Sequence, residues 1–135
     1  MDIDSYDIIL ERLKDFNEKS EQNFGNEIVE YPTTNTTFPY TIFEEVRNVQ
    51  NPRFKSPYDR VASVGYIVRI YAKNQGDYDK KTIARRCAKI VDDYLTSIGL
   101  TRTSFNVNDL VNEGSIYEII ELYSGNLHEF RKKFI

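Results

Sequence analysis

The side chains that most often carry out covalent chemistry are scarce in this sequence. The only histidine is His128, close to the C-terminus, and the only cysteine is Cys87. Nucleophilic catalysis needs a base beside a serine or cysteine, and chain ends are usually too poorly ordered to supply one. Cys87 can be a small buried hydrophobe or a reactive thiol, and its place on an apolar helical stripe favours the buried interpretation. We therefore predict no nucleophilic centre.

Metal and phosphate motifs are incomplete. His128 and Glu129 begin like the zinc motif HExxH, but Lys132 stands where the second histidine is needed. The run Asp77-Tyr78-Asp79 lacks the further oxygen ligands of a calcium loop and fits the start of a helix better. The six glycines are scattered and match neither GxxxxGK[ST] nor GxGxxG. The sequence predicts no metal site and no cofactor.

Adjacent carboxylates occur twice, at Glu44-Glu45 and at Asp92-Asp93. Neighbouring residues on a strand point to opposite faces, and on a helix they diverge by about 100°. Neither pair is therefore an acid/base dyad by itself, although folding could bring distant carboxylates together. We predict that the protein is not an enzyme. The alternative is a small enzyme or binding module whose site joins distant carboxylates and tyrosines.

Two short segments combine aromatic anchors with cations, the residue types that contribute most to protein interfaces. One is the run from Arg53 to Lys55 and the other the run from Phe130 to Phe134. The interface candidates are Arg53, Phe54, Lys55, Phe130, Arg131, Lys132 and Phe134. A solvated loop and a frayed end are the alternative interpretation.

Two amphipathic helices are expected to organise the chain. Residues 77–99 carry apolar side chains at steps of three and four, opposite a charged face that is typical of a solubilising surface. Acidic residues at its start suit the helix dipole, and Gly99 can close its C-terminus. Residues 4–17 repeat apolar groups at the same spacing. The polar stretch Glu18–Pro39 predicts mainly loop, in which Glu27–Tyr31 could add a short strand.

Strand patterns fill most of the remaining chain. Residues 40–49 and 60–73 predict a hairpin whose long connector, 50–59, projects as an arm. Residues 101–107 and 115–123 predict a second hairpin around the turn 108–114. The order helix, hairpin, helix, hairpin predicts one α+β domain over residues 1–135, with an approximately four-stranded, mainly antiparallel sheet and helices packed on one face.

The second face of this sheet is expected to be half apolar. On the long strand, Val61, Gly65, Ile67 and Tyr71 alternate with the residues of the predicted helix-covered face. A solvated sheet face is mostly polar, so something else should cover this one, either the N-terminal helix or a neighbouring subunit.

Composition limits the class of protein. The net charge of −3, with both signs interspersed, argues against a general nucleic-acid binder. Ten tyrosines and eight phenylalanines without tryptophan suit either extensive subunit contacts or half-exposed strands. The first residues do not form a basic and then apolar leader, and no run approaches the roughly 18 apolar residues of a membrane span. We expect a soluble protein made in a cytosol.

Several segments resemble the tail-terminator or tail-completion proteins of long-tailed bacteriophages. The resemblance rests on FPYTIFEEVRN at 38–48, VASVGYIVRIYAKN at 61–74, KKTIARRCAKIVDDYLTSIGL at 80–100 and the two closing strands. It covers nearly the whole chain through patterns of strand and helix. Glu18–Pro39 and the basic tail have no counterpart in it.

The resemblance implies a structural virion protein that forms a ring, typically a hexamer, at the end of the finished tail tube. Such a ring binds the tail-tube protein and the head connector, and DNA passes through it without specific binding. It also implies that the arm around Arg53 and the tail 130–135 contact neighbours. Another phage neck component, such as a head-completion or connector protein, is the alternative with the same size and charge.

Overall fold

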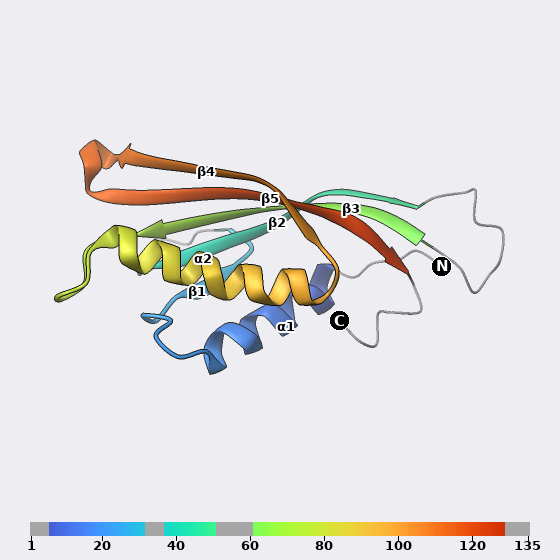
Figure 1. Ribbon diagram of the computed structural model, residues 1–135, viewed down its shortest axis with the longest axis horizontal. Helices are drawn as coiled ribbons and strands as arrows, with labels where there is room; N and C mark the ends of the chain where they lie inside the picture. The colour runs from blue at the N-terminus through green and yellow to red at the C-terminus, as the bar shows by residue number, and fades with distance from the viewer. Residues whose placement is uncertain (1–5, 32–36, 51–60, 129–135) are drawn as a thin grey trace.

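The structure is a computed structural model that describes residues 6–31, 37–50 and 61–128. This part of the chain forms two α-helices, one 3-10 helix and five strands (Figure 1). In chain order they are α1 (Tyr6–Lys19), β1 (Glu27–Val29), β2 (Tyr40–Gln50), β3 (Val61–Ala72), α2 (Lys80–Ser97), β4 (Thr101–Val111), η1 (Asn112–Gly114) and β5 (Ile116–His128). The strands form one sheet in the order β1-β2-β3-β5-β4.

The predicted α+β class is confirmed, and most strand pairs are antiparallel as predicted. The sheet has five strands and is mixed, because β1 pairs parallel to β2 while the other neighbours are antiparallel. Figure 1 shows α1 and α2 on the same side of the sheet. Strand β1 lies within Glu27–Tyr31, where the sequence allowed a short strand.

Helix α2 buries the predicted apolar stripe against the sheet. The stripe residues Ile83, Ala84, Cys87, Ile90, Val91, Tyr94 and Leu95 are all buried. The helix begins three residues later than predicted because the Asp79 carboxylate caps it, accepting a hydrogen bond from the Thr82 backbone N–H at 2.7 Å. At the other end, Gly99 has φ +96°, and the Leu100 N–H bonds back to the Leu95 carbonyl.

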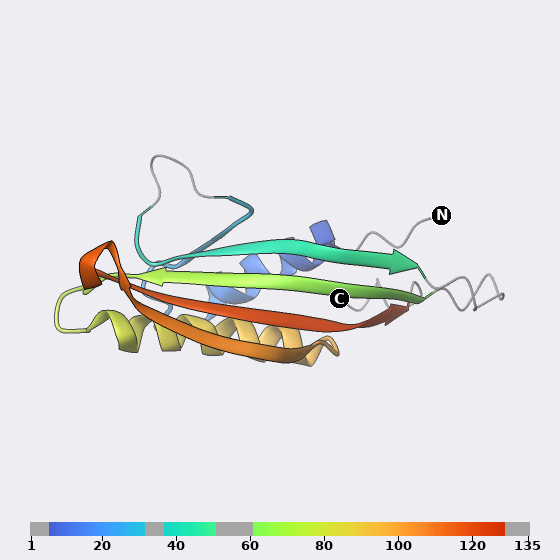
Figure 2. The same cartoon turned by 90° about the horizontal axis from the view of Figure 1, so that it is seen from above.

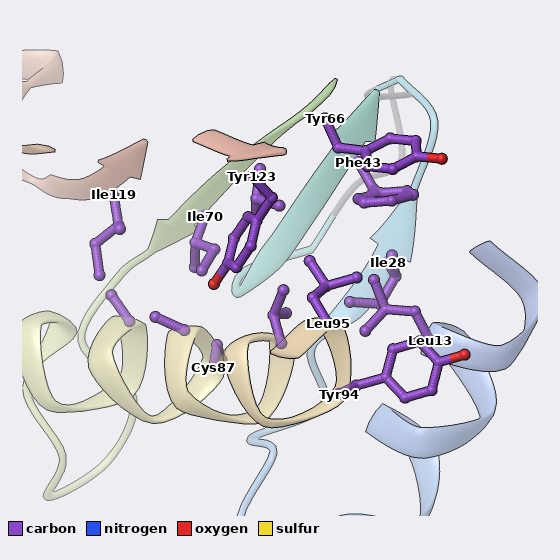
Figure 3. Packing of buried hydrophobic residues seen from close by; sticks show 14 of the residues in the cluster. Leu13, Ile28, Phe43, Tyr66, Ile70, Cys87, Tyr94, Leu95, Ile119 and Tyr123 are labelled. Carbon is purple, nitrogen blue, oxygen red and sulfur yellow. The ribbon is translucent and has the colours of Figure 1, made fainter. Parts of the chain in front are cut away.

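The helix-facing side of the sheet follows strand alternation. On β3 the side chains of Val64, Tyr66, Val68 and Ile70 are buried, and on β5 those of Tyr117, Ile119 and Tyr123 are buried. Figure 3 shows aromatic and aliphatic side chains from both strands meeting α2 and α1. The core is therefore a single layer between one face of the sheet and the two helices.

The second hairpin is longer than its sequence predicts. Strand β4 continues to Val111 and β5 continues to His128, so the turn is confined to η1. The last residues of β5 pair with β3, as His128 does with Val61. Ser124 and Asn126 are polar and Gly125 has no side chain, so alternation of hydrophobicity does not reveal this pairing, which depends on backbone hydrogen bonds.

A buried polar network holds the loop between α1 and β1. Asn17 donates through Nδ2 to the Asn26 carbonyl at 2.7 Å, and Asn23 donates to the Asn17 carbonyl at 2.7 Å. The Thr41 hydroxyl bonds to Asn26 Oδ1 at 3.1 Å. These bonds satisfy buried polar groups and fix β1 beside the start of β2.

Helix α1 does not cover the second face of the sheet. Its apolar residues Ile9, Leu10 and Leu13 are buried in the same core as α2. Tyr6 stacks on Phe43 with ring centroids 5.4 Å apart, and its hydroxyl donates to the Phe43 carbonyl at 2.5 Å. The expectation that the N-terminal helix could cover the second face is therefore wrong, because its stripe is occupied on the other side.

We expect Cys87 of the folded protein to resist alkylation by a maleimide. Its side chain is 0% exposed, and burial raises the pKa of the thiol to about 12, so almost no thiolate exists at neutral pH. Mass spectrometry should show modification in denaturant and little without it. Equally fast labelling under both conditions would contradict the buried interpretation.

Candidate assembly surface

The residues predicted for contacts with neighbours lie outside the described residues. This holds for Arg53, Phe54, Lys55, Phe130, Arg131, Lys132 and Phe134. The structure does describe where the chain enters both segments. Strand β2 ends at Gln50, which pairs with Ala62, and Val61 pairs with His128, the last residue of β5. The segments 51–60 and 129–135 therefore start from the same end of the sheet.

The side of the sheet opposite the helices, called the open face here, is partly apolar. Figure 2 looks down on it. In register across β2, β3 and β5 it presents the rows Tyr40–Tyr71–Glu118, Ile42–Arg69–Ile120 and Glu44–Ile67–Leu122. Most of these side chains are half-buried by their neighbours, and Leu122 is 38% exposed. Neither described helix lies over this face (Figures 1 and 2), while at one end of it Phe38 packs on Tyr40 with ring centroids 5.1 Å apart.

On the open face, side chains of neighbouring strands contact each other through an ion pair and a ring stack. Arg69 Nη1 lies 3.0 Å from Glu44 Oε1, and both side chains are more than one third exposed. The rings of Tyr40 and Tyr71 stack with centroids 5.1 Å apart. Burial and the hydrogen bond to Glu118 raise the pKa of the Tyr71 hydroxyl. An exposed ion pair adds little stability, so the face combines apolar area with charges that a partner could meet.

Two long strand edges have no partner strand among the described residues. Strand β1 pairs only with Tyr40–Ile42, which leaves the rest of β2 as an edge, and β4 forms the other border. The β2 edge carries two exposed valines, Val46 at 60% and Val49 at 56%. Val46 lies where a bulge interrupts the register between Glu45 and Arg47. Unpaired edges of this length are templates for pairing with another chain.

The directions of the two edge strands are compatible with each other. Each pair from β2 through β3 and β5 to β4 is antiparallel, so β2 and β4 run in opposite directions. If β4 of one copy lies beside β2 of another, the two strands meet as an antiparallel pair and the sheet continues. Such a head-to-tail contact joins different surfaces and can close into a ring.

Carboxylates from different elements also meet within the fold. The Tyr123 hydroxyl lies 2.7 Å from Asp92 Oδ1 on α2 and 3.2 Å from Glu121 Oε2 on β5. Arg102 of β4 donates through Nη1 to Glu121 Oε2 at 3.1 Å. We call Asp92, Arg102, Glu121 and Tyr123 the buried acid cluster. The sequence did not lead us to predict a role for Glu121. A signal was present, because this glutamate lies between Ile119 and Tyr123 on the apolar side of an alternating strand.

The adjacent carboxylates behave as their spacing predicts. Glu44 pairs with Arg69 on the open face, while Glu45 lies opposite Tyr66, which faces the helices. On α2, Asp93 pairs with Lys89 at 3.3 Å, whereas Asp92 accepts from the Tyr123 hydroxyl.

A surface hollow of about 310 Å³ lies beside the acid cluster and is lined by Arg85, Ala88, Lys89, Asp92, Arg102 and Phe105. Glu121 is 0% exposed and does not line it. Among the described residues, no group of three or more histidine, cysteine or acidic side chains could hold a metal ion.

The described helices include none with the length and apolar content needed to cross a bilayer. Comparisons with known proteins add no identification. No protein-family model matches the sequence, and a search of curated proteins gives no match.

Proposed function

We propose that the protein is a structural virion subunit that forms a ring at the end of a phage tail tube and joins it to the head connector. The observation that carries the proposal is the pair of open, oppositely directed edges on β2 and β4, beside a half-apolar open face. Identical copies can hide these edges from each other, which removes the hazard of exposed strands. The resemblance to tail-terminator proteins supplies the virion context.

The shape of the molecule supports this proposal in a second way. Both helices lie on one side of the sheet, so a neighbour can approach either edge without meeting a helix on the open face (Figures 1 and 2). The chain is also mildly acidic at −3, and like charge keeps DNA from binding to the wall of a conduit.

Oligomeric state tests the proposal directly. Light scattering on the purified protein, alone and mixed with tail-tube protein, should give a defined mass of several subunits in at least one condition. A monomer at every concentration in both conditions would overturn it. Binding to tail-tube protein and to head connector, each immobilised separately, distinguishes a tail terminator from another neck component, because a head-side protein should bind only the connector.

Charge reversal in the arm should weaken assembly without unfolding the subunit. We expect Arg53→Glu with Lys55→Glu to reduce the assembled fraction, because it reverses the charge of the arm that the sequence predicts to contact a neighbour. A substitution in a surface loop, as the sequence predicts here, usually changes stability by less than about 0.5 kcal/mol, so the subunit should stay folded. Lys14→Glu with Lys81→Glu is the matched control, because it makes the same change in net charge at exposed helix positions. Assembly lost equally in both variants would point to net charge, and assembly unchanged in the arm variant would exclude the arm.

A further inference from the structure

When Asp92 and Glu121 are both ionised, the buried acid cluster has too few hydrogen-bond donors for its oxygen atoms. Glu121 is 0% exposed, and among the described residues its Oε1 has no hydrogen-bond partner. Its Oε2 accepts from Arg102 at 3.1 Å and lies 3.2 Å from the Tyr123 hydroxyl. A buried carboxylate with one unsatisfied oxygen is costly when ionised, so this arrangement favours the neutral acid.

The Tyr123 hydroxyl has one proton for two acceptors. Figure 3 shows this hydroxyl pointing from β5 toward α2. The shorter contact, 2.7 Å to Asp92 Oδ1, identifies Asp92 as the acceptor of that proton. With both carboxylates ionised, the 3.2 Å contact to Glu121 would join two oxygens without a proton between them. A proton on Glu121 Oε2 donates to the tyrosine oxygen and completes the chain Glu121 to Tyr123 to Asp92.

The charged side chains around the cluster do not replace the missing hydrogen-bond donor. Arg102 on β4 is the cation that contacts Glu121, and it faces two carboxylates, those of Glu121 and Asp92. Lys89 of α2 pairs with Asp93, and Arg85 donates to the Tyr117 hydroxyl at 3.4 Å. The residues paired with Glu121 on its two sides are apolar, Val68 on β3 and Phe105 on β4. Burial raises the pKa of the Glu121 carboxyl, and Arg102 opposes that shift.

We infer that Asp92, Tyr123 and Glu121 form a proton-binding site in which Glu121 takes up one proton at a higher pH than an exposed glutamate does. The site joins α2, through Asp92, to β5 and, through Arg102, to the edge strand β4. Protonation completes a hydrogen-bonded link between helix and sheet, and deprotonation leaves two carboxylates competing for one hydroxyl. This inference stands whether or not copies of the protein assemble.

A carboxyl carbon-13 NMR titration of the full chain labelled in glutamate tests the site. Glu121→Gln, which keeps the side-chain shape, identifies the Glu121 signal by its disappearance. We expect that signal to titrate above pH 4.5, the ordinary value for glutamate, and above the other glutamates. A midpoint at or below theirs would overturn the inference, because Arg102 would then hold Glu121 ionised.

Asp92→Asn tests the sharing of the hydroxyl. Without the charge on Asp92, the Tyr123 proton is free to bond to Glu121, so the Glu121 midpoint should fall. Asp93→Asn is the matched control, since Asp93 faces Lys89 outside the cluster, and it should leave the midpoint unchanged. An unchanged or higher midpoint in Asp92→Asn, or an equal shift in the control, would contradict the shared proton.

Stability against pH supplies an independent readout. A pKa that is raised in the folded state stabilises the protein below the unfolded pKa, and this contribution is lost as pH rises through the folded pKa. The unfolding midpoint of the wild type should therefore fall relative to that of Glu121→Gln as pH rises from 4.5 through the folded-state pKa of Glu121. A difference that stays constant over this interval would overturn the inference.

Discussion

Phe43→Ala is expected to lower the free energy of unfolding by about 3–5 kcal/mol, the range for truncating a fully buried aromatic side chain. Phe43 is 0% exposed on the helix-facing side of β2. Its ring stacks on those of Tyr6, at 5.4 Å, and Tyr66, at 5.0 Å, and the two tyrosine rings also contact each other at 6.4 Å. Removing it leaves a cavity and deprives both tyrosines of one stacking partner. Urea unfolding at a concentration where the protein is monomeric measures the change.

Val49→Ala is the matched control on the same strand. Its side chain is 56% exposed, so truncation should change the free energy of unfolding by less than about 0.5 kcal/mol. Equal losses of unfolding free energy in the two variants would show that the burial of Phe43 does not determine how much it contributes to stability.

Helices and strands whose apolar residues repeat at a regular spacing were predictable from sequence. The apolar residues of α2 recur every three or four positions, and β3 alternates over its described length, so both the type of element and its buried face follow from the side chains alone. The ends of helices and strands were predicted less accurately. Asp77 and Asp79 are both acidic, and it is Asp79 that caps α2. Strand β5 extends to His128 because its backbone pairs with β3.

The short strand and the acid cluster depend on contacts between distant residues. Strand β1 has only three residues, and it is held by buried Asn17 of α1 and by Asn26, which lies in the segment predicted as loop. Glu121 breaks the apolar alternation of β5, but its partners Asp92 and Arg102 lie on two other elements. Nothing in sequence spacing brings these residues together, because helix packing on the sheet sets their distances.

At a pH where Glu121 stays ionised in the folded protein, Arg102→Gln should lower the free energy of unfolding by about 3 kcal/mol, the lower end of the range for breaking a buried ion pair. The lower end applies because the Arg102 side chain is 40% exposed, so water replaces part of its contact, while that of Glu121 is 0% exposed. The loss arises mainly from the Glu121 charge, which keeps its burial and loses its cation. Urea unfolding measures this change, with Arg85→Gln as the control. Arg85 is exposed on α2 over the same Phe105 ring, so its loss should be below about 0.5 kcal/mol.

The pH dependence of this loss identifies its origin. Without Arg102, the folded-state pKa of Glu121 rises further. The loss is therefore small at low pH, where Glu121 is neutral, and grows as pH rises from the folded-state pKa of the wild type to that of the variant. Above both values, combining Arg102→Gln with Glu121→Gln should restore most of the stability, because no buried charge remains without a partner. A loss independent of pH that the second substitution does not relieve would instead assign the effect to the packing of the arginine on Phe105, whose ring lies 4.9 Å from its guanidinium carbon.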